Sequence, residues 1–484
     1  MSTSDKLMNG ILAASSVGAL LGSAYVIYKT ITEDNEEDKD DSGVLVLDRK
    51  PSGHTNAPRE VNSSAIEKHK MIQSLDTSFR ADEADGRDVS SQIFRICISG
   101  GPKSGITTAI SKISENLTAL GYKVFIVPSC FNLTASSGFN IFDETLPMED
   151  RLQVLITFMK MLMKLEDYFL DMAHDEVDSN VVILYTMGTM DVKARVRPDL
   201  WEAMLSEASW AEVTLRGRFS LTFSDKRYDM VMHMTTSAVG AAEFFDDKLY
   251  SADEAMQIDK KMNECWNGHA KLVIVKNLPG KAFRDKIAYC MTSVNSLIGL
   301  PTKNQYYLKF LLDVDSAANL EFPDDVTVQS HYLTESFLKS SRKEVQIRLS
   351  KRVEYFLIKS QNGVNRFVYS CRAPSKVDGE RMEMMKQISA QEYMEYKSYI
   401  IRDSMEVEKQ VYSFICDNTS YQIERFLNTP ERPAILRVEG NQEVQQKDLP
   451  SFLRVKEEIT GSSYLSRKFE IFHLLPGYSK ASEK

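Results

Sequence analysis

The sequence predicts an α/β P-loop domain with a parallel sheet, followed by an antiparallel β-barrel domain, with an N-terminal transmembrane helix ahead of both. Three observations lead to this fold class. A glycine-rich stretch, Gly100–Thr108, lies between an apolar run and an amphipathic run, which is the context of a phosphate-binding loop. Apolar runs then alternate with helical patterns up to about residue 300. From about residue 303 the hydrophobic period changes to two, as in antiparallel strands.

Composition limits the classes of protein that this chain can belong to. Its 484 residues exceed one ordinary core, and 43% hydrophobic with 26% charged residues is typical of globular domains. The net charge of -9 argues against a nucleic-acid partner. The six cysteines form no C-x-x-C pair and the seven histidines show no ligand spacing, so we expect reduced thiols and no zinc site.

The N-terminus predicts a membrane anchor over residues 1–29, followed by an acidic flexible tether over 30–91. Leu7–Tyr28 contains no charged residue and is long enough to span a bilayer, for which about 20 residues suffice. A cleaved signal peptide is the alternative interpretation. The tether is polar and carries an acidic run, Glu33–Asp41. We expect a single-pass protein of the mitochondrial or endoplasmic-reticulum membrane, with its body facing a reducing compartment.

Residues 92–300 predict the parallel-sheet domain. Five apolar runs predict its strands: Ile93–Ile98, Val124–Val127, Val181–Tyr185, Met230–Met234 and Leu272–Val275. Four helical patterns cover Met148–His174, Asp199–Leu205, Ala252–Trp266 and Ala282–Leu297. Ligands of such sheets sit at the carboxyl ends of the strands. Those ends coincide with Ser99–Thr107, Pro128–Ser129 and Thr186–Asp191.

The glycine-rich stretch fits the spacing G-x-x-x-x-G-K-[ST] at every position but one, because Ile106 stands where the lysine should be. Backbone N–H groups of such a loop wrap a phosphate, and the helix that follows adds a favourable dipole. Lys103, at the tip of the loop, either substitutes for the missing lysine or is an exposed loop lysine. The candidate nucleotide-binding residues, in vestigial form, are Gly100, Gly101, Lys103, Ser104, Gly105, Thr107 and Thr108.

Several motifs in this region resemble one family. The run GGPKSGITTAISKISENLTALGYKVFIVP, Gly100 to Pro128, is similar to the start of the AAA-type, nicotinamide-kinase-like ATPase domain of the TRPL translocation-defect protein family. Further similar segments follow in the same order: Lys164–Ala173, Gly188–Ala194, Arg227–Phe245 and Asp259–His269. Together they cover most of residues 92–300 and are fairly specific.

The departures from this family predict lost chemistry. Besides Ile106, Thr186 and Met187 replace an acidic and a basic residue, Ser129 replaces a glutamate, and an arginine is missing near Ser251. The resemblance implies that each lost group contacts phosphate, magnesium or attacking water. Thr107 and Asp191 remain, and the resemblance implies that they could still hold Mg²⁺ beside ATP or GTP.

Residues 303–475 predict an antiparallel domain, before a tail over 476–484. Strands are expected at Tyr307–Asp313, Ile347–Glu354, Phe367–Cys371, Arg381–Ile388, Glu408–Cys416, Tyr421–Phe426 and Ile435–Glu439. Their alternating polar and apolar residues suit a closed barrel with a polar lumen. The family just named carries a CYTH-like, triphosphate-tunnel domain here, and similar pieces are Arg348–Gly363, Lys386–Tyr393 and Leu449–Tyr464.

In active tunnel enzymes, the resemblance implies, basic residues grip phosphates and paired glutamates hold a metal. Here Arg437 stands where a paired-glutamate strand would begin, and Tyr306–Phe310 lacks an E-x-E-x-K pattern. We therefore expect no tunnel hydrolysis. The basic residues of the sheet either bind a polyanion or form an ordinary solvated face; the candidates are Arg348, Arg352, Arg366 and Arg372.

Because two separate sites each lack essential groups, the sequence predicts a catalytically degenerate, NTPase-like protein anchored to a membrane. It would act as an adaptor or structural subunit of a membrane-associated complex with protein partners, and the family name implies membrane-protein trafficking. Two alternatives stay open: a nucleotide-binding regulatory protein or active NTPase or kinase, and a polyphosphate- or phosphoinositide-binding module. No catalytic residue is assigned.

Overall fold

The computed structural model describes residues 92–460, apart from 139, 177–178, 207–226, 301, 304–305, 314–319, 340–344, 355–363, 375–379, 402–405, 429–433 and 441–448. The predicted anchor, tether and tail lie outside the described residues. Among the residues that are described, no helix has the length and apolar character needed to cross a membrane.

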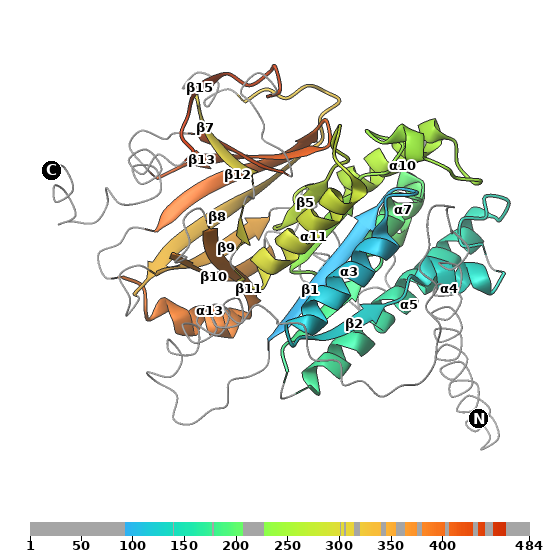
Figure 1. Cartoon of the computed structure of the whole chain (residues 1–484), viewed down its shortest axis with the longest axis horizontal. Helices are drawn as coiled ribbons and strands as arrows, with labels where there is room; N and C mark the ends of the chain where they lie inside the picture. The colour runs from blue at the N-terminus through green and yellow to red at the C-terminus, as the bar shows by residue number, and fades with distance from the viewer. Residues whose placement is uncertain are drawn as a thin grey trace, which may run out of the picture.

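A five-stranded parallel sheet forms the first domain (Figure 1). Its strands are β1 (Ile93–Gly100), β2 (Lys123–Val127), β3 (Val181–Tyr185), β4 (Met230–Met234) and β5 (Leu272–Val275), in the order β2-β3-β1-β4-β5. Every neighbouring pair is parallel, which confirms the predicted parallel sheet. Strands β3 and β4 are buried at every position, because helices cover both faces of the sheet.

Helices cover the two faces of this sheet in separate groups. They are α3 (Ile106–Ala119), α4 (Cys130–Ser136), α5 (Met148–His174), α6 (Thr189–Lys193), α7 (Pro198–Ser206), α10 (Ala252–Cys265) and α11 (Phe283–Leu297), with a short 3-10 helix η2 (Ala242–Phe244). Helices α3 and α11 bury their apolar side chains with Ile96 and Ile98 of β1. Helices α5 and α7 pack on the opposite face, where Cys97 of the same strand points. Alternate residues of β1 therefore belong to two different cores.

Ten strands form the second sheet, and every pairing in it is antiparallel. They are β6 (Thr302–Lys303), β7 (Tyr306–Leu312), β8 (Val328–Leu338), β9 (Gln346–Glu354), β10 (Val364–Pro374), β11 (Glu380–Ile388), β12 (Val407–Cys416), β13 (Thr419–Phe426), β14 (Ala434–Gly440) and β15 (Val455–Glu458). A helix, α13 (Ala390–Lys397), packs against β9 and β10. The predicted antiparallel domain is confirmed. The expected closure is not found among the described residues, because the order runs from β15 to β6 and these two strands do not pair.

Strand β8 is the longest element that the sequence pattern failed to predict. It pairs with β9 and β12 in the middle of the sheet. Its buried positions include His331, Glu335 and Ser336, so polar residues stand where an apolar alternation would reveal a strand.

The two domains contact each other through β5, which lies against β13 and β14, and through α11, which lies against β6 and β11 (Figure 1). The side-chain amide of Asn267 donates to the backbone carbonyls of Thr327 at 2.8 Å and Ser413 at 3.2 Å. Lys271 forms a largely buried ion pair with Glu439 of β14, at 2.9 Å. Beyond the carboxyl end of β5, Lys276 donates to the carbonyl of Asp417 in the β12–β13 hairpin.

Candidate functional site

The glycine-rich loop connects β1 to α3 and is shaped as an anion-binding turn. Lys103 and Gly105 adopt left-handed backbone conformations, with φ of 55° and 90°. Alternation of left- and right-handed residues turns successive N–H groups to one side, which makes a concave site for an anion. The first helical hydrogen bond runs from the Ala109 amide to the Gly105 carbonyl at 3.0 Å. The amides of Ile106, Thr107 and Thr108 precede it and are available to a ligand.

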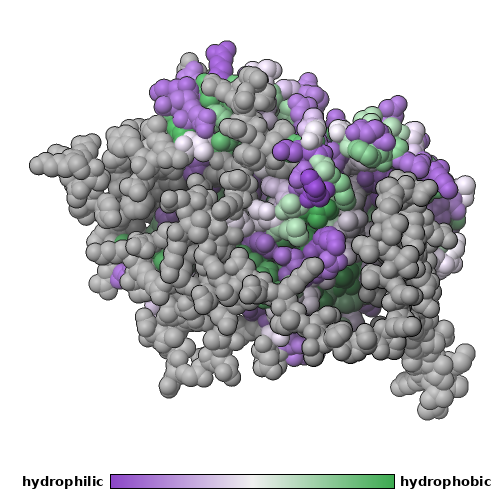
Figure 2. All heavy atoms as spheres, viewed as in Figure 1, coloured by the Kyte–Doolittle hydropathy of each residue, from purple (hydrophilic) through white to green (hydrophobic). Residues whose placement is uncertain are grey.

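A cavity of about 1300 Å³ opens in front of this loop. The loop forms one wall, and the segments Ser237–Phe244 and Lys276–Tyr289 supply the others. Six of the predicted nucleotide-binding residues line it: Gly101, Lys103, Ser104, Gly105, Thr107 and Thr108. Gly100 and Asp191 are not part of the lining. On the face shown in Figure 2, apolar residues gather around α11 and hydrophilic residues border them.

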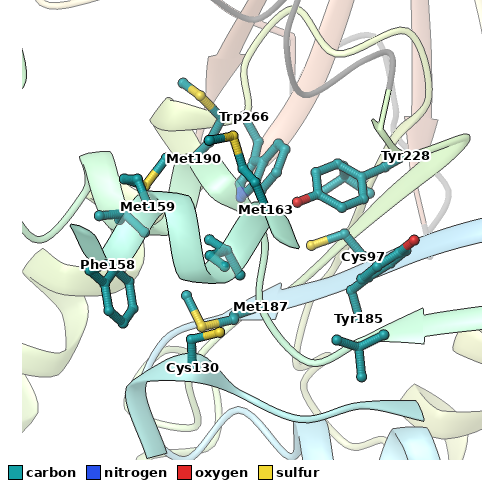
Figure 3. Packing of buried hydrophobic residues seen from close by; sticks show 14 of the residues in the cluster. Cys97, Cys130, Phe158, Met159, Met163, Tyr185, Met187, Met190, Tyr228 and Trp266 are labelled. Atoms are coloured by element: carbon teal, nitrogen blue, oxygen red, sulfur yellow. The ribbon is translucent and has the colours of Figure 1, made fainter. Parts of the chain in front are cut away.

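Asp191, the predicted metal-binding acid, lies in the core at the start of α6, with 1% of its surface exposed. Its carboxylate accepts hydrogen bonds from the Ser99 hydroxyl at 2.5 Å, the Trp266 indole at 2.7 Å and the Gly188 amide at 2.8 Å. Trp266 is fully buried and lies beside Tyr228 and Met190 (Figure 3). Three protein donors thus bind the carboxylate, two of them at Oδ1 and one at Oδ2. Its predicted role as a magnesium ligand stays a prediction.

The neighbouring position that the resemblance assigns to a basic residue is part of the same apolar core. Met187 is 5% exposed and packs in the cluster that contains Cys130 and Tyr185 (Figure 3). Its sulfur accepts a hydrogen bond from the Ser129 hydroxyl at 3.4 Å. A hydroxyl–thioether contact therefore stands where the family pattern has a carboxylate and a guanidinium, and it brings no charge to the edge of the sheet.

Asp259 of α10 holds the back of the loop, a role that the sequence did not reveal. Its buried carboxylate accepts from the backbone amides of Gly101 at 3.0 Å and Thr236 at 2.9 Å. His233, at the end of β4, places its Nε2 atom 3.3 Å from the same oxygen. A Cβ atom at Gly101 would lie 2.6 Å from that oxygen, so this approach requires glycine. In the sequence, Asp259 begins the family-like segment Asp259–His269, but nothing there shows that its carboxylate binds the loop.

Lys286 of α11 supplies a buried cation at the cavity wall. Its ammonium donates to the Ser104 carbonyl at 3.1 Å, the Thr235 carbonyl at 2.7 Å and the Asn277 side-chain oxygen at 2.8 Å. Burial lowers the pKa of Lys286 to about 8. The three acceptors use all three N–H donors, so this lysine ties the loop to the ends of β4 and β5. In the sequence, Lys286 is a single lysine within a helical pattern, and nothing there predicts that it binds the loop.

The second sheet contains a continuous row of opposite charges across five strands. Arg348 of β9 pairs with Glu335 of β8 at 3.1 Å, and Glu335 pairs with Lys409 of β12 at 2.5 Å. Lys409 also binds Glu424 of β13 at 3.0 Å, and Glu424 binds Arg437 of β14 at 2.8 Å. Burial alone would raise the pKa of Glu335, but Lys409 and Arg348 outweigh it and lower this pKa to about 2.

The centre of this row is one ammonium between two buried carboxylates. Lys409 is 1% exposed, and Glu335 and Glu424 are each 4% exposed. The cations that balance these two glutamates, Lys409 together with Arg348 and Arg437, therefore belong to the protein itself. Glu439, the acid near the expected metal strand, is held by Lys271. Within the described ranges, no group of three or more His, Cys, Asp or Glu side chains could hold a metal ion.

The four arginines predicted to bind a polyanion are engaged within the protein in different ways. Arg372 pairs with Glu383 at 3.0 Å, and Arg348 lies 3.8 Å from the same carboxylate. Arg352 donates to the Gly268 carbonyl of the first domain. Arg366 is 3% exposed, and burial lowers its pKa to about 9. Polyanion binding by these residues stays a prediction.

Comparisons with known proteins give weak likenesses. No protein-family model matches this chain, and no curated protein matches it. The inorganic triphosphatase NE1496 shares 18% identity over 36% of this chain and 97% of its own, with a TM-score of 0.24. Deoxyadenosine kinase from M. mycoides with bound dATP shares 16% identity over 42% of this chain and 99% of its own, with a TM-score of 0.26. A chain of the Schizosaccharomyces pombe Mediator head module shares 16% identity over 30% of this chain and 85% of its own, with a TM-score of 0.21. Membership of the TRPL family stays a prediction.

Replacing Asp191 tests its structural role. Asp191→Ala should lower the free energy of unfolding by at least about 3 kcal/mol, because three buried donors lose their acceptor. Asp171→Ala removes an exposed carboxylate of α5 and should change it by less than about 0.5 kcal/mol. Urea unfolding followed by tryptophan fluorescence measures both. If Asp191→Ala kept full stability and lost magnesium binding, the carboxylate would be a metal ligand instead.

The lowered pKa of Lys286 predicts a specific pH dependence. The unfolded chain binds this proton up to a pKa of about 10.4, whereas the folded protein releases it near pH 8. Between these values, the free energy of unfolding of the natural protein should rise with pH relative to that of Lys286→Met. Paired denaturant titrations at pH 7, 8, 9 and 10 measure the difference. A difference that stays constant over this range would contradict the assignment.

Lys409 should be among the residues most sensitive to substitution. Lys409→Met leaves two buried carboxylates without their shared cation and should cost about 3–5 kcal/mol of folding free energy. The control Lys397→Met, at a 40% exposed lysine of α13, should cost less than about 1 kcal/mol. Thermal and urea unfolding check both variants, and equal losses would show that the buried row contributes no more than a surface pair.

Proposed function

We propose that this protein is a catalytically degenerate P-loop protein that acts as an adaptor or structural subunit of a membrane-associated complex, and that it is a diverged member of the TRPL family. The observation that carries the proposal is the state of Asp191. The acid that would hold a metal ion is enclosed by Ser99, Gly188 and Trp266, while Ile106 leaves the loop without its lysine.

Phosphoryl transfer depends on positioned positive charge, because the transferred group carries negative charge through the transition state. In this chain the loop position that supplies the charge is an isoleucine, and Ile106 packs partly against the core. The sheet edge that would organise metal and water contributes Met187 and a buried carboxylate that already accepts three hydrogen bonds from the protein. These changes leave a phosphate-sized cradle without a catalytic cation.

The second domain supports the same conclusion by a different route. Hydrolysis of a triphosphate in a tunnel needs free carboxylates for a metal and free basic groups for the phosphates. Here the ammonium of Lys409 pairs with both Glu335 and Glu424, and Arg348 and Arg437 add a second cation at each of these glutamates. A divalent cation would meet a site whose negative charge is already balanced.

What both domains retain is a well-ordered platform. The parallel and antiparallel sheets are joined by buried polar contacts of Asn267 and Lys271, so they present one composite surface. The predicted anchor at Leu7–Tyr28 would hold this surface at a mitochondrial or endoplasmic-reticulum membrane, where it would serve protein partners, and a role in membrane-protein trafficking follows from the resemblance. The six cysteines are free thiols, which suits a body in a reducing compartment.

Turnover assays test the absence of catalysis. The detergent-solubilised full chain should release phosphate from ATP, GTP and inorganic triphosphate no faster than buffer, with either magnesium or manganese. The variant Thr107→Ala, which removes the hydroxyl of the loop threonine, should give the same rate. Magnesium-dependent hydrolysis by the natural chain that disappears in Thr107→Ala would overturn the proposal.

A second measurement tests the adaptor role itself. On native gels of mildly solubilised membranes, the protein should migrate in an assembly larger than its 55.0 kDa chain. The assembly should persist in Thr107→Ala, because its formation does not depend on chemistry at the loop. Migration as a single chain in both cases would contradict a structural role in a complex.

A further inference from the structure

We propose that residues 242–256, from η2 to the first turns of α10, form the surface on which a partner protein docks, and that this partner presents an apolar groove bordered by Lys and Arg side chains. The inference rests on the proposed adaptor role and names the chemistry of the partner. We call these residues the docking segment. Three of its properties carry the proposal: exposed apolar side chains, an ordered backbone and an excess of negative charge.

Large apolar side chains of the docking segment are exposed to solvent. Leu249 is 83% exposed and Phe244 is 75% exposed, the two highest values among the large apolar residues that the structure describes. Met256 of α10 adds a third exposed apolar side chain. Single exposed apolar residues are common on protein surfaces, whereas several on one short segment indicate an interaction site. The segment lies beside α10, at the upper right of Figure 1.

Hydrogen bonds hold the backbone that carries these side chains. Ahead of the segment, the side-chain amide of Asn277 donates to the Val239 carbonyl at 2.8 Å. Within it, the Asp247 carboxylate accepts from the backbone amide of Leu249 at 2.7 Å. Ser251 then caps α10, and its hydroxyl accepts from an amide of the first turn. The apolar side chains are therefore displayed on a pre-organised surface, which loses little conformational entropy when a partner binds.

Acidic side chains surround the exposed apolar ones. The docking segment contains five acids and one base, which are Glu243, Asp246, Asp247, Asp253, Glu254 and Lys248. Among the described residues, none of these acids forms an ion pair with a basic side chain. The negative charge of the segment is therefore unbalanced within the described protein. A partner with Lys and Arg side chains around its apolar contact would complement this charge.

The same charge selects among the possible occupants of the docking segment. The anionic surface of a membrane attracts basic segments and would repel this acidic one. A second copy of the chain, docked through the same surface about a two-fold axis, would bring two acidic surfaces face to face. The net charge of -9 on the whole chain also favours the approach of a basic partner. The occupant is therefore a different protein with a basic border around an apolar groove.

Site-specific photocrosslinking of the full chain in native membranes identifies the occupant. One chain carries Leu249→benzoylphenylalanine, and a matched chain carries the same group at Met394, which is 67% exposed on α13. The first should capture a protein whose crosslinked peptides are net positive, and the second should not capture that protein. Crosslinks to lipid alone, to a second copy of this chain or to a peptide without basic residues would each overturn the inference, as would the absence of any crosslink.

Removal of the apolar anchors tests the first property. Phe244→Ser combined with Leu249→Ser should leave the fold intact, because both side chains are exposed. Dilution series on native gels of mildly solubilised membranes should show an assembly weakened by at least about tenfold, a factor that corresponds to about 1.4 kcal/mol. The control Met394→Ser removes an exposed apolar side chain of α13 and should leave the assembly unchanged. Equal weakening in the control would overturn the assignment of the docking segment.

Charge reversal tests the complementarity. Asp246→Lys combined with Asp253→Lys should weaken the assembly by about tenfold at low ionic strength, because like charges would then face each other. Raising NaCl from about 0.1 to about 1 M should weaken the natural assembly, and should not weaken that of the reversed variant. An assembly that persists unchanged in both double variants would overturn the docking segment and leave the adaptor role standing. Migration of the natural protein as a single chain would overturn both.

Discussion

The buried carboxylate of Asp191 is the constraint on which much of this structure depends. It joins the end of β1, through Ser99, to the start of α6 and to the indole of Trp266. Trp266 in turn fixes the turn that follows α10, and the next two residues, Asn267 and Gly268, make the contacts that hold the second domain. The acid that the resemblance predicts as a metal ligand therefore links β1, α6 and the turn after α10 in this structure.

The glycine-rich loop keeps its shape by means of side chains outside its own sequence. Asp259 binds the Gly101 amide from one side, and Lys286 binds the Ser104 carbonyl from the other. Both side chains are almost completely buried. A loop held in this way is organised before any ligand arrives, which lowers the entropic cost of binding. The groups that shape the loop backbone are therefore residues other than Ile106, the position where the loop pattern expects a lysine.

In the antiparallel sheet, buried charged side chains are stabilised by pairing with one another. Its basic and acidic side chains neutralise one another across neighbouring strands, with Lys409 at the centre. Such a network contributes to a unique arrangement of strands only while it is complete, because any unpaired member is costly in the interior.

The sequence by itself determined the parallel sheet, the turn at Gly105 and the missing lysine at Ile106, because these follow from local patterns of apolar residues and glycines. Among the described strands, the sequence also located most of the antiparallel ones. It did not predict β8, because the polar residues His331 and Glu335 occupy buried positions and hide the apolar alternation of a strand. Only the tertiary structure decided which partners the buried charged side chains bind. Asp191 meets Ser99 across 92 residues of chain, and Lys286 meets Ser104 across 182. Whether such a group binds a ligand or the protein depends on which elements become neighbours in space, and no local pattern records that.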